Sequence, residues 1–180
     1  MSNDNSVFPG GIDEGYQAPT GFYQNPEAFY SWALTQVGIS RLDRSDLKGE
    51  CVTLVARYIQ EVKFSASMRT TRYSYGNGKD TASVVANNSP FNQYFGGYTR
   101  SGLPSRGAVI SFNTSHIYGH TGIVMASRYD SSGRRQVQIL ESNWGTNKGI
   151  NSTVRISPWF YIDYKNGSVI YTARGWANPR

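Results

Sequence analysis

Short apolar runs separated by turn residues fill the second half of the chain, and this pattern limits the fold more than any other. Gly, Asn, Asp and Ser cluster between the runs, at residues 130–133 and 165–167 for example. Runs of this length with turn residues between them predict antiparallel strands joined by short connections. The predicted strands cover residues 108–112, 121–126, 136–141, 153–156 and 168–173.

The first half of the chain carries helical patterns instead. Apolar residues recur at spacings of three and four in residues 51–62, and a proline follows a capping asparagine at the start of residues 25–37. A shorter helix is predicted for residues 80–87, and the rest of 64–100 is predicted to form loops. Helices followed by several strands predict an α+β fold with an antiparallel sheet. We expect residues 1–24 to form an irregular arm and residues 25–180 a single domain.

The formal net charge of +6 favours an anionic partner. The basic residues are scattered, however, and the nearest approach to a cluster is Arg128, Arg134 and Arg135. No stretch combines basic and aromatic residues as nucleic-acid motifs do, so we expect no nucleic-acid partner.

The chain begins without a basic segment followed by an apolar run, which is the pattern of a signal peptide. No stretch approaches the roughly 18 apolar residues that span a bilayer, so we expect no stable membrane insertion. We therefore expect synthesis in the cytoplasm, and we expect a monomer. Action outside the cell would need another export route.

Cys51 is the only cysteine and lies in the first turn of the helix predicted for residues 51–62. Unpaired backbone N–H groups and the positive end of the helix dipole favour the thiolate there, which is the nucleophilic form. Free cysteine is also among the most buried residue types, so an inert structural thiol remains an alternative.

A thiol nucleophile needs a base that exchanges protons near neutral pH, and the chain has two histidines, His116 and His120. His120 begins a predicted strand between Gly119 and Gly122, where the missing side chains let a substrate or another backbone approach. His116 lies in a loop without such neighbours. A surface or capping role is the alternative for either histidine.

A third polar group lies at the end of the strand predicted for residues 136–141. Strand alternation places Glu141 on the face of Val137 and Ile139, and Asn143 joins them if the strand continues. A carboxylate or amide at that place could accept an imidazole N–H and so fix the tautomer and orientation of a catalytic histidine.

Taken in order, these residues resemble the CHAP family, the cysteine- and histidine-dependent amidohydrolases and peptidases of the papain-like NlpC/P60 superfamily. The resemblance covers about residues 26–178. It rests on five segments: Gly49-Glu50-Cys51-Val52, residues 104–110, Gly119-His120-Thr121-Gly122, Glu141-Ser142-Asn143-Trp144-Gly145 and Ala173-Arg174-Gly175-Trp176.

The resemblance implies a papain-like CHAP fold, in which N-terminal helices pack on a C-terminal antiparallel sheet of about five or six strands. It also implies catalysis by Cys51 as nucleophile, His120 as general base and Glu141 as the orienting residue, with Asn143 as a further polar member. The implied activity is that of a phage endolysin or a related peptidoglycan hydrolase. Such an enzyme cuts the muramoyl-alanine amide or a bond within the wall peptides.

Neighbours of these catalytic residues are expected to bind substrate, and no cofactor is expected. The substrate-binding residues are Glu50, Tyr118, Gly119 and Trp144. Glu50 departs from the family, which commonly has glutamine before the cysteine.

We expect no bound metal, because Leu42, Arg44 and Lys48 interrupt the alternating oxygen ligands of the calcium loop that some members carry. Two other functions stay open. One is a wall- or partner-binding module without turnover, and the other is an intracellular amidase on a non-wall substrate.

Overall fold

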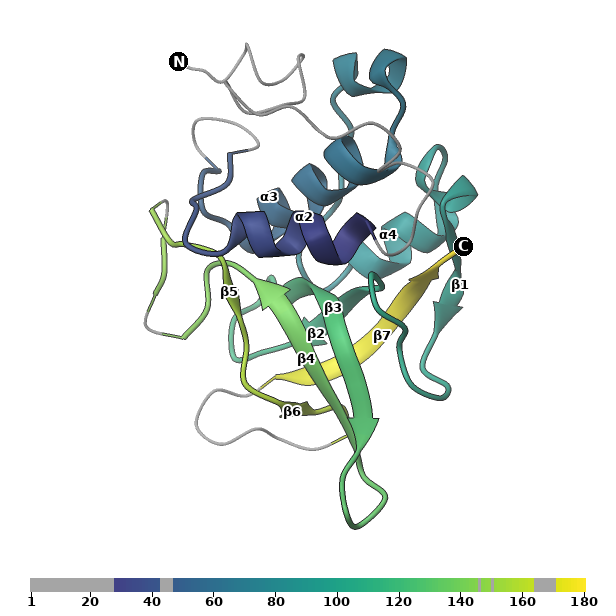
Figure 1. Cartoon of the computed structure of the whole chain (residues 1–180), viewed down its shortest axis with the longest axis vertical. Coiled ribbons are helices and arrows are strands. Elements are labelled where there is room, and N and C mark those ends of the chain that lie inside the picture. Colours follow the sequence, from purple (N-terminus) through teal and green to yellow (C-terminus); the bar gives the residue numbers. More distant parts are fainter. Residues whose placement is uncertain (1–27, 43–46, 146, 150, 164–170) are drawn as a thin grey trace. The chain divides into compact units, whose positions relative to one another are not determined.

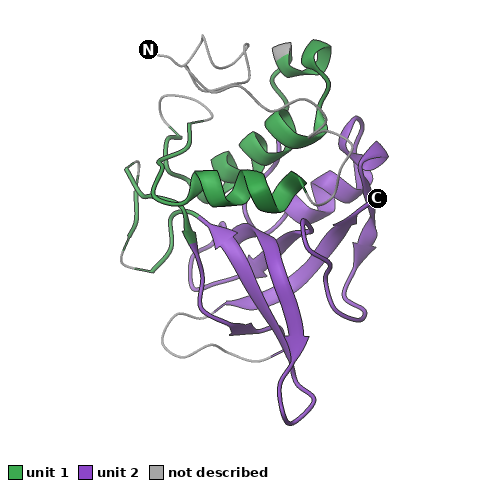
Figure 2. Ribbon diagram, in the orientation of Figure 1, with its two compact units in different colours: residues 1–74, 142–155 green, residues 75–141, 156–180 purple. Residues whose placement is uncertain are grey.

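The structure is a computed structural model that describes residues 28–42, 47–145, 147–149, 151–163 and 171–180. The chain divides into two compact units, shown in different colours in Figure 2. Unit 1 comprises residues 1–74 and 142–155, and unit 2 comprises residues 75–141 and 156–180. The predicted arm of residues 1–24 lies outside the described residues.

Unit 1 contains the helices that precede residue 75 (Figure 1). They are α2 (Ala28–Gln36), α3 (Cys51–Tyr58), the π-helix η2 (Ile59–Lys63) and the 3₁₀-helix η3 (Ala66–Thr70). The helix predicted for residues 51–62 is therefore confirmed, although its last turn widens into a π-helix. Among the described residues of the whole chain, no helix is long and apolar enough to cross a membrane.

A buried carboxylate joins the helices of unit 1. Glu61 of η2 accepts a hydrogen bond at 3.0 Å from Trp32 Nε1 of α2 and forms an ion pair with Arg41. Arg57, one turn earlier, lies 3.9 Å from the same carboxylate. Partners of this kind are required because an unpaired buried charge is strongly destabilising. Glu61 thus fixes α2 and the loop after it against the α3–η2 segment.

Unit 2 is built on an antiparallel sheet, which confirms the predicted α+β class. Its order is β1-β7-β2-β3-β4-β5, and β6 pairs with β4. The short strand β5 lies at the boundary of the two units, and helix α4 contacts β1, β2 and β7. The elements are α4 (Thr81–Asn87), the 3₁₀-helix η4 (Phe91–Gln93), β1 (Phe95–Thr99), β2 (Val109–Asn113), β3 (His120–Tyr129), β4 (Arg135–Glu141), β5 (Arg155–Ile156), β6 (Phe160–Tyr161) and β7 (Thr172–Pro179).

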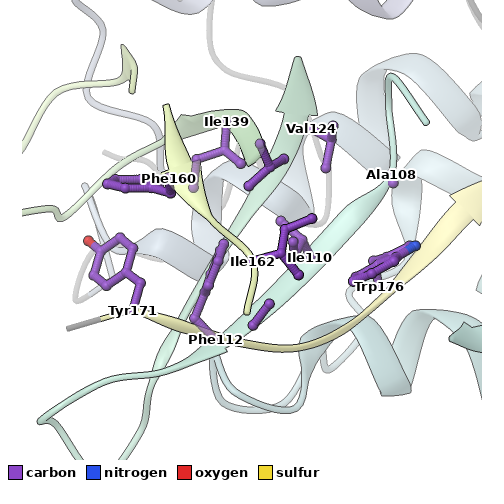
Figure 3. Close-up of a cluster of buried hydrophobic side chains, with 11 residues drawn as sticks. Ala108, Ile110, Phe112, Val124, Ile139, Phe160, Ile162, Tyr171 and Trp176 are labelled. Atoms are coloured by element: carbon purple, nitrogen blue, oxygen red, sulfur yellow. The ribbon is translucent and has the colours of Figure 1, made fainter. Parts of the chain in front are cut away.

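The apolar core of unit 2 lies against β2, the strand between β7 and β3 (Figure 3). Ile110 and Phe112 are fully buried, as the apolar run predicted. The other members of this cluster are Ala108, Val124, Val137, Ile139, Phe160, Ile162, Tyr171, Ala173 and Trp176. Burial of these side chains holds β3 and β4 in the register that the functional site requires.

Strand β1 was not predicted, because Gly96 and Gly97 interrupt its apolar pattern and the segment was expected to be a loop. Pairing with β7 supplies what the sequence pattern lacks. The ring of Tyr98 occupies the space beside Gly175 of β7, where a Cβ would lie 2.5 Å from the ring. Gly175 therefore permits the pairing instead of ending the strand.

The last strand was predicted for residues 168–173, and the predicted end of this strand was wrong. Strand β7 begins at Thr172 and continues to Pro179, while residues 168–170 lie outside the described residues. Glycine and asparagine have low strand propensity, yet β7 continues through Gly175 and Asn178 because it pairs with both β1 and β2. Tertiary pairing thus overrides a weak local preference.

Two glycines allow a loop to approach the start of β3 in unit 2. Gly119 has φ +67°, and a Cβ there would lie 2.5 Å from both Lys79 Cβ and the carbonyl oxygen of Phe112. A Cβ at Gly78 would lie 2.9 Å from the Cα of His120. The N–H of Lys79 also donates to the carbonyl of Tyr118 at 2.9 Å. From the sequence, either a substrate or another backbone was expected to approach Gly119, and the structure shows a backbone there.

Replacement of Gly119 by alanine is therefore expected to lower the free energy of unfolding by about 2–4 kcal/mol, since both backbone strain and a clash are introduced. Gly133 is the matched control, because it has φ +78° but no atom within 4 Å of an added Cβ. Gly133→Ala should cost about 1 kcal/mol. Urea denaturation followed by circular dichroism measures both, and equal losses would contradict the proposed clash.

Candidate active site

Cys51 is the first residue of α3 and is 8% exposed. The chain turns into the helix through Gly49, which has φ +80°, and through Glu50, which is extended. The carbonyl of Glu50 accepts hydrogen bonds from the Thr53 N–H at 3.2 Å and from Thr53 Oγ1 at 2.6 Å. These bonds begin the helix at Cys51 and leave the thiol beside first-turn N–H groups that lack intrahelical acceptors.

Glu50, the departure from the family pattern, uses its carboxylate as a hydrogen-bond acceptor within unit 1. Asn143 Nδ2 donates to Glu50 Oε2 at 2.8 Å, and Asn143 Oδ1 accepts from the Gly149 N–H at 3.0 Å. Asn143 has φ +59°, a left-handed conformation that asparagine tolerates better than most residues. Strand β4 has already ended at Glu141, so the condition that the strand continues to Asn143 is wrong.

Two serines that were not predicted support the same turn. Ser142 and Ser152 are buried, and each donates its hydroxyl to the carbonyl of Gly49 at 2.5 Å. Ser152 Oγ also accepts the Asn143 N–H at 2.8 Å. Serines in a polar loop form no sequence pattern, so these hydrogen bonds could not be predicted. The segment after β4 is thereby fastened to the turn that precedes Cys51.

His120 and Glu141 meet in unit 2. His120 Nε2 lies 2.7 Å from Glu141 Oε1, and the two residues are 3% and 0% exposed. One residue begins β3 and the other ends β4, and antiparallel pairing brings these two strand ends together. An ionised carboxylate only accepts hydrogen bonds, so Nε2 carries the proton between them. In the neutral imidazole, Nδ1 then holds the basic lone pair.

Aromatic rings enclose the imidazole. The ring centroid of Tyr171 lies 4.7 Å from that of His120, and the centroid of Phe112 lies at 6.2 Å. Phe112 is the direct partner of His120 across β2 and β3, so the sheet register places it there. Tyr171 precedes β7 and was not predicted, since nothing in the local sequence distinguishes it. These contacts restrict rotation of the imidazole.

The residues predicted to bind substrate differ in their surroundings. Tyr118 is 56% exposed, and its ring lies 5.2 Å from that of His116. In unit 1, Trp144 donates its indole N–H to the carbonyl of Thr153 at 3.1 Å and is covered by the Arg155 guanidinium at 3.5 Å. Their substrate-binding roles stay predictions, as do those of Glu50 and Gly119.

Among the described residues, no group of three or more His, Cys, Asp or Glu side chains could hold a metal ion. Asp43 and Asp46, which lie just before the cysteine, fall outside those residues. The expected absence of a metal therefore stays a prediction.

The chain matches a family model and resembles one solved structure. The crystal structure of a wild-type endolysin, LysIME-EF1, matches with a TM-score of 0.53 and 18% identity. The match covers 86% of this chain and 64% of that chain, so the protein spans about two thirds of the endolysin's length. No curated protein matches the chain.

The family model is that of the CHAP domain, and it matches residues 42–143. The matched segment is more than half of the 180 residues and contains Cys51, His120 and Glu141. The chain belongs to the CHAP domain family.

Proposed function

We propose that the protein is a peptidoglycan hydrolase that cleaves an amide bond with Cys51 as nucleophile, His120 as general base and Glu141 as the orienting residue. One observation carries the proposal, namely the buried hydrogen bond between His120 and Glu141 inside the segment that matches the family. The similar solved structure is that of an endolysin, and the net charge of +6 suits an anionic wall.

The His120–Glu141 pair has the properties that proton transfer requires. With Nε2–H donated to the carboxylate, Nδ1 can take the thiol proton, and the nearby negative charge stabilises the imidazolium that forms. Burial strengthens that interaction, because few water molecules screen it. The packing of Phe112 and Tyr171 keeps the ring in one orientation.

The proposed reaction has two halves. The Cys51 thiol gives its proton to His120, the sulfur attacks the amide carbon, and the C–N bond breaks as the imidazolium returns the proton to the leaving amine. Water then gives a proton to His120 and attacks the thioester, which releases a carboxylate and restores the thiol. The backbone N–H of Cys51 is the first candidate donor to the oxyanion. The proposal requires the thiol and the imidazole to come within proton-transfer distance.

Glu50 and Asn143 are assigned positioning roles in this scheme. Their hydrogen bond, with those from Ser142 and Ser152 to Gly49, supports the turn that sets the start of α3. Tyr118 and Trp144 are proposed to contact the wall substrate.

The scissile bond is the muramoyl-alanine amide or a bond within the wall peptides. Mass spectrometry of the products decides between them, because each cleavage exposes a different free amine. Action at the wall is proposed to follow holin-type release, virion delivery or another secretion route, with the protein acting as a monomer.

Replacement of Cys51 by alanine or serine is expected to reduce the release of new amino groups from purified peptidoglycan by at least about 1,000-fold, since no covalent intermediate can form at the same rate. The substitutions remove or exchange a single atom, so the melting temperature should change by only a few degrees. Undiminished release by a folded Cys51→Ala protein would refute the proposal.

Glu141→Gln is expected to lower kcat by about 100-fold or more, because the side-chain amide cannot neutralise an imidazolium and can favour the wrong tautomer. Glutamine is nearly isosteric, so the fold should be retained. The kcat and the pH profile on a soluble muropeptide, compared with the melting curve, separate this role from a structural one. A folded variant with the wild-type kcat and pH profile would contradict it.

Glu50→Gln is expected to preserve the bond from Asn143, since the amide oxygen also accepts, while removing the negative charge of the residue that precedes Cys51. Because a neighbouring carboxylate disfavours the thiolate, iodoacetamide should alkylate the variant about two- to ten-fold faster at pH 7. Equal alkylation rates in the two proteins would mean that the Glu50 charge does not act on Cys51.

A further inference from the structure

Arginine and aromatic side chains stack on one another in unit 2, near the place where the β3–β4 hairpin pairs with β6. Figure 1 shows the course of these strands. Arg128 pairs directly with Gln136, and Gln136 pairs directly with Tyr161, so these three side chains share one face of the sheet. Arg134 and Trp159 lie just outside β4 and β6 and join this group through ring contacts, since Arg134 stacks on Tyr161 and Arg128 stacks on Trp159. We call these five residues the stacked-arginine surface.

Arg128 is held in place by Trp159 and Gln136 and forms no ion pair with a carboxylate of the described residues. Its guanidinium lies 3.9 Å from the ring centroid of Trp159, and its Nε donates to Gln136 Oε1 at 2.8 Å. The residue is exposed, and no carboxylate among the described residues forms an ion pair with it. The stack and the Nε bond thus orient the guanidinium and leave its two Nη groups as the donors for an external acceptor.

Arg134, on the same surface, is neutralised. It stacks on Tyr161 at 4.7 Å and donates Nε to Asp130 Oδ2 at 2.8 Å. Tyr161 Oη donates to the same oxygen at 3.0 Å. Hydrogen bonds from the backbone N–H groups of Arg134 and Ser132, with those two side-chain bonds, lower the pKa of Asp130 to about 2. Asp130 therefore stays ionised, and Arg128 is the uncompensated cation of this surface.

We infer that Arg128 binds a phosphodiester group of an anionic wall polymer, so that the stacked-arginine surface holds the enzyme on its substrate. The planar fork of a guanidinium matches the paired oxygens of a phosphate, and an oriented guanidinium loses less entropy when it binds. The inference rests on the proposed function, because it takes the bacterial wall as the place where the protein acts.

A wall polymer fits better than nucleic acid. Affinity for nucleic acid comes mainly from several phosphate contacts at once, whereas this surface offers one uncompensated cation. A repeating polymer anchored in the wall presents many phosphates at high local concentration, so even a weak site retains the protein. Trp159 packs against the guanidinium and offers apolar ring surface beside it to the linked sugar or polyol.

Cosedimentation with purified walls tests the inference, with Cys51→Ala present in every protein so that the walls stay intact. Arg128→Gln should weaken binding at least about five-fold to walls that carry the phosphodiester polymer, and Arg128→Lys should recover part of the loss, since it keeps the charge without the fork. On walls stripped of the polymer, Arg128→Gln should bind like its parent.

Arg180→Gln is the matched control. Arg180 is exposed and also donates Nε to one protein oxygen, Asn92 O at 3.3 Å, so this variant loses the same charge at a site outside the surface. It should bind within two-fold of the parent protein. Equal losses for the two variants would overturn the inference. So would parent binding to stripped walls that is as tight as to walls that carry the polymer, or equal competition by single-stranded DNA and soluble wall polymer.

Hydrolysis of a soluble muropeptide without the polymer separates this inference from the proposed function. The Arg128→Gln enzyme with Cys51 restored should hydrolyse that substrate at the wild-type rate. If the wild-type protein does not hydrolyse it, the proposed function fails, while the cosedimentation result with the Cys51→Ala proteins still decides the role of Arg128.

Discussion

Glu141 places a fully buried carboxylate against the imidazole of His120, and the arrangement of unit 2 depends on satisfying it. A carboxylate removed from water is costly unless it is hydrogen-bonded, and His120 Nε2 is the partner that the sheet provides. The antiparallel pairing of β3 and β4 brings the two residues together, and the apolar core fixes the register. Loss of that register would leave the charge without this partner.

A few hydrogen bonds also hold the start of α3 in unit 1. One carbonyl, that of Gly49, accepts hydroxyl groups from Ser142 and Ser152, and the next residue binds Asn143 through its side chain. These contacts join a distant segment of the chain to the turn before Cys51. The family commonly has glutamine at the position of Glu50. A carboxylate oxygen accepts the hydrogen bond from the Asn143 amide as well as a glutamine oxygen would, which explains why glutamate fits here.

Sequence patterns predicted the parts of the fold that bury regular apolar runs. Strands β2 and β3 were found as short apolar runs between turn residues, β4 by its alternation, and the α3–η2 segment by apolar residues at helical spacing. The pairing of His120 with a polar residue at the end of β4 was also predicted, since a buried polar group requires a partner. Each strand and helix prediction rests on a pattern that the local sequence can show.

Features that depend on distant segments could not be predicted. Strand β1 contains two glycines and forms because it pairs with β7. Asn143 leaves the strand in a left-handed conformation, a choice that its bonds to Glu50 and Gly149 favour. Tyr171 reaches the imidazole from the far end of the sequence. None of these contacts has a local pattern, so only tertiary structure shows them.

Because Cys51 is the only cysteine, titration of the thiol tests the catalytic account most directly. The protein would be alkylated in steps with iodoacetamide, the modified fraction measured by intact mass, and amide cleavage of peptidoglycan measured on the same samples. The account predicts that activity falls in proportion to the modified fraction and reaches zero at one equivalent per chain. Cleavage that persists in fully alkylated protein would contradict it.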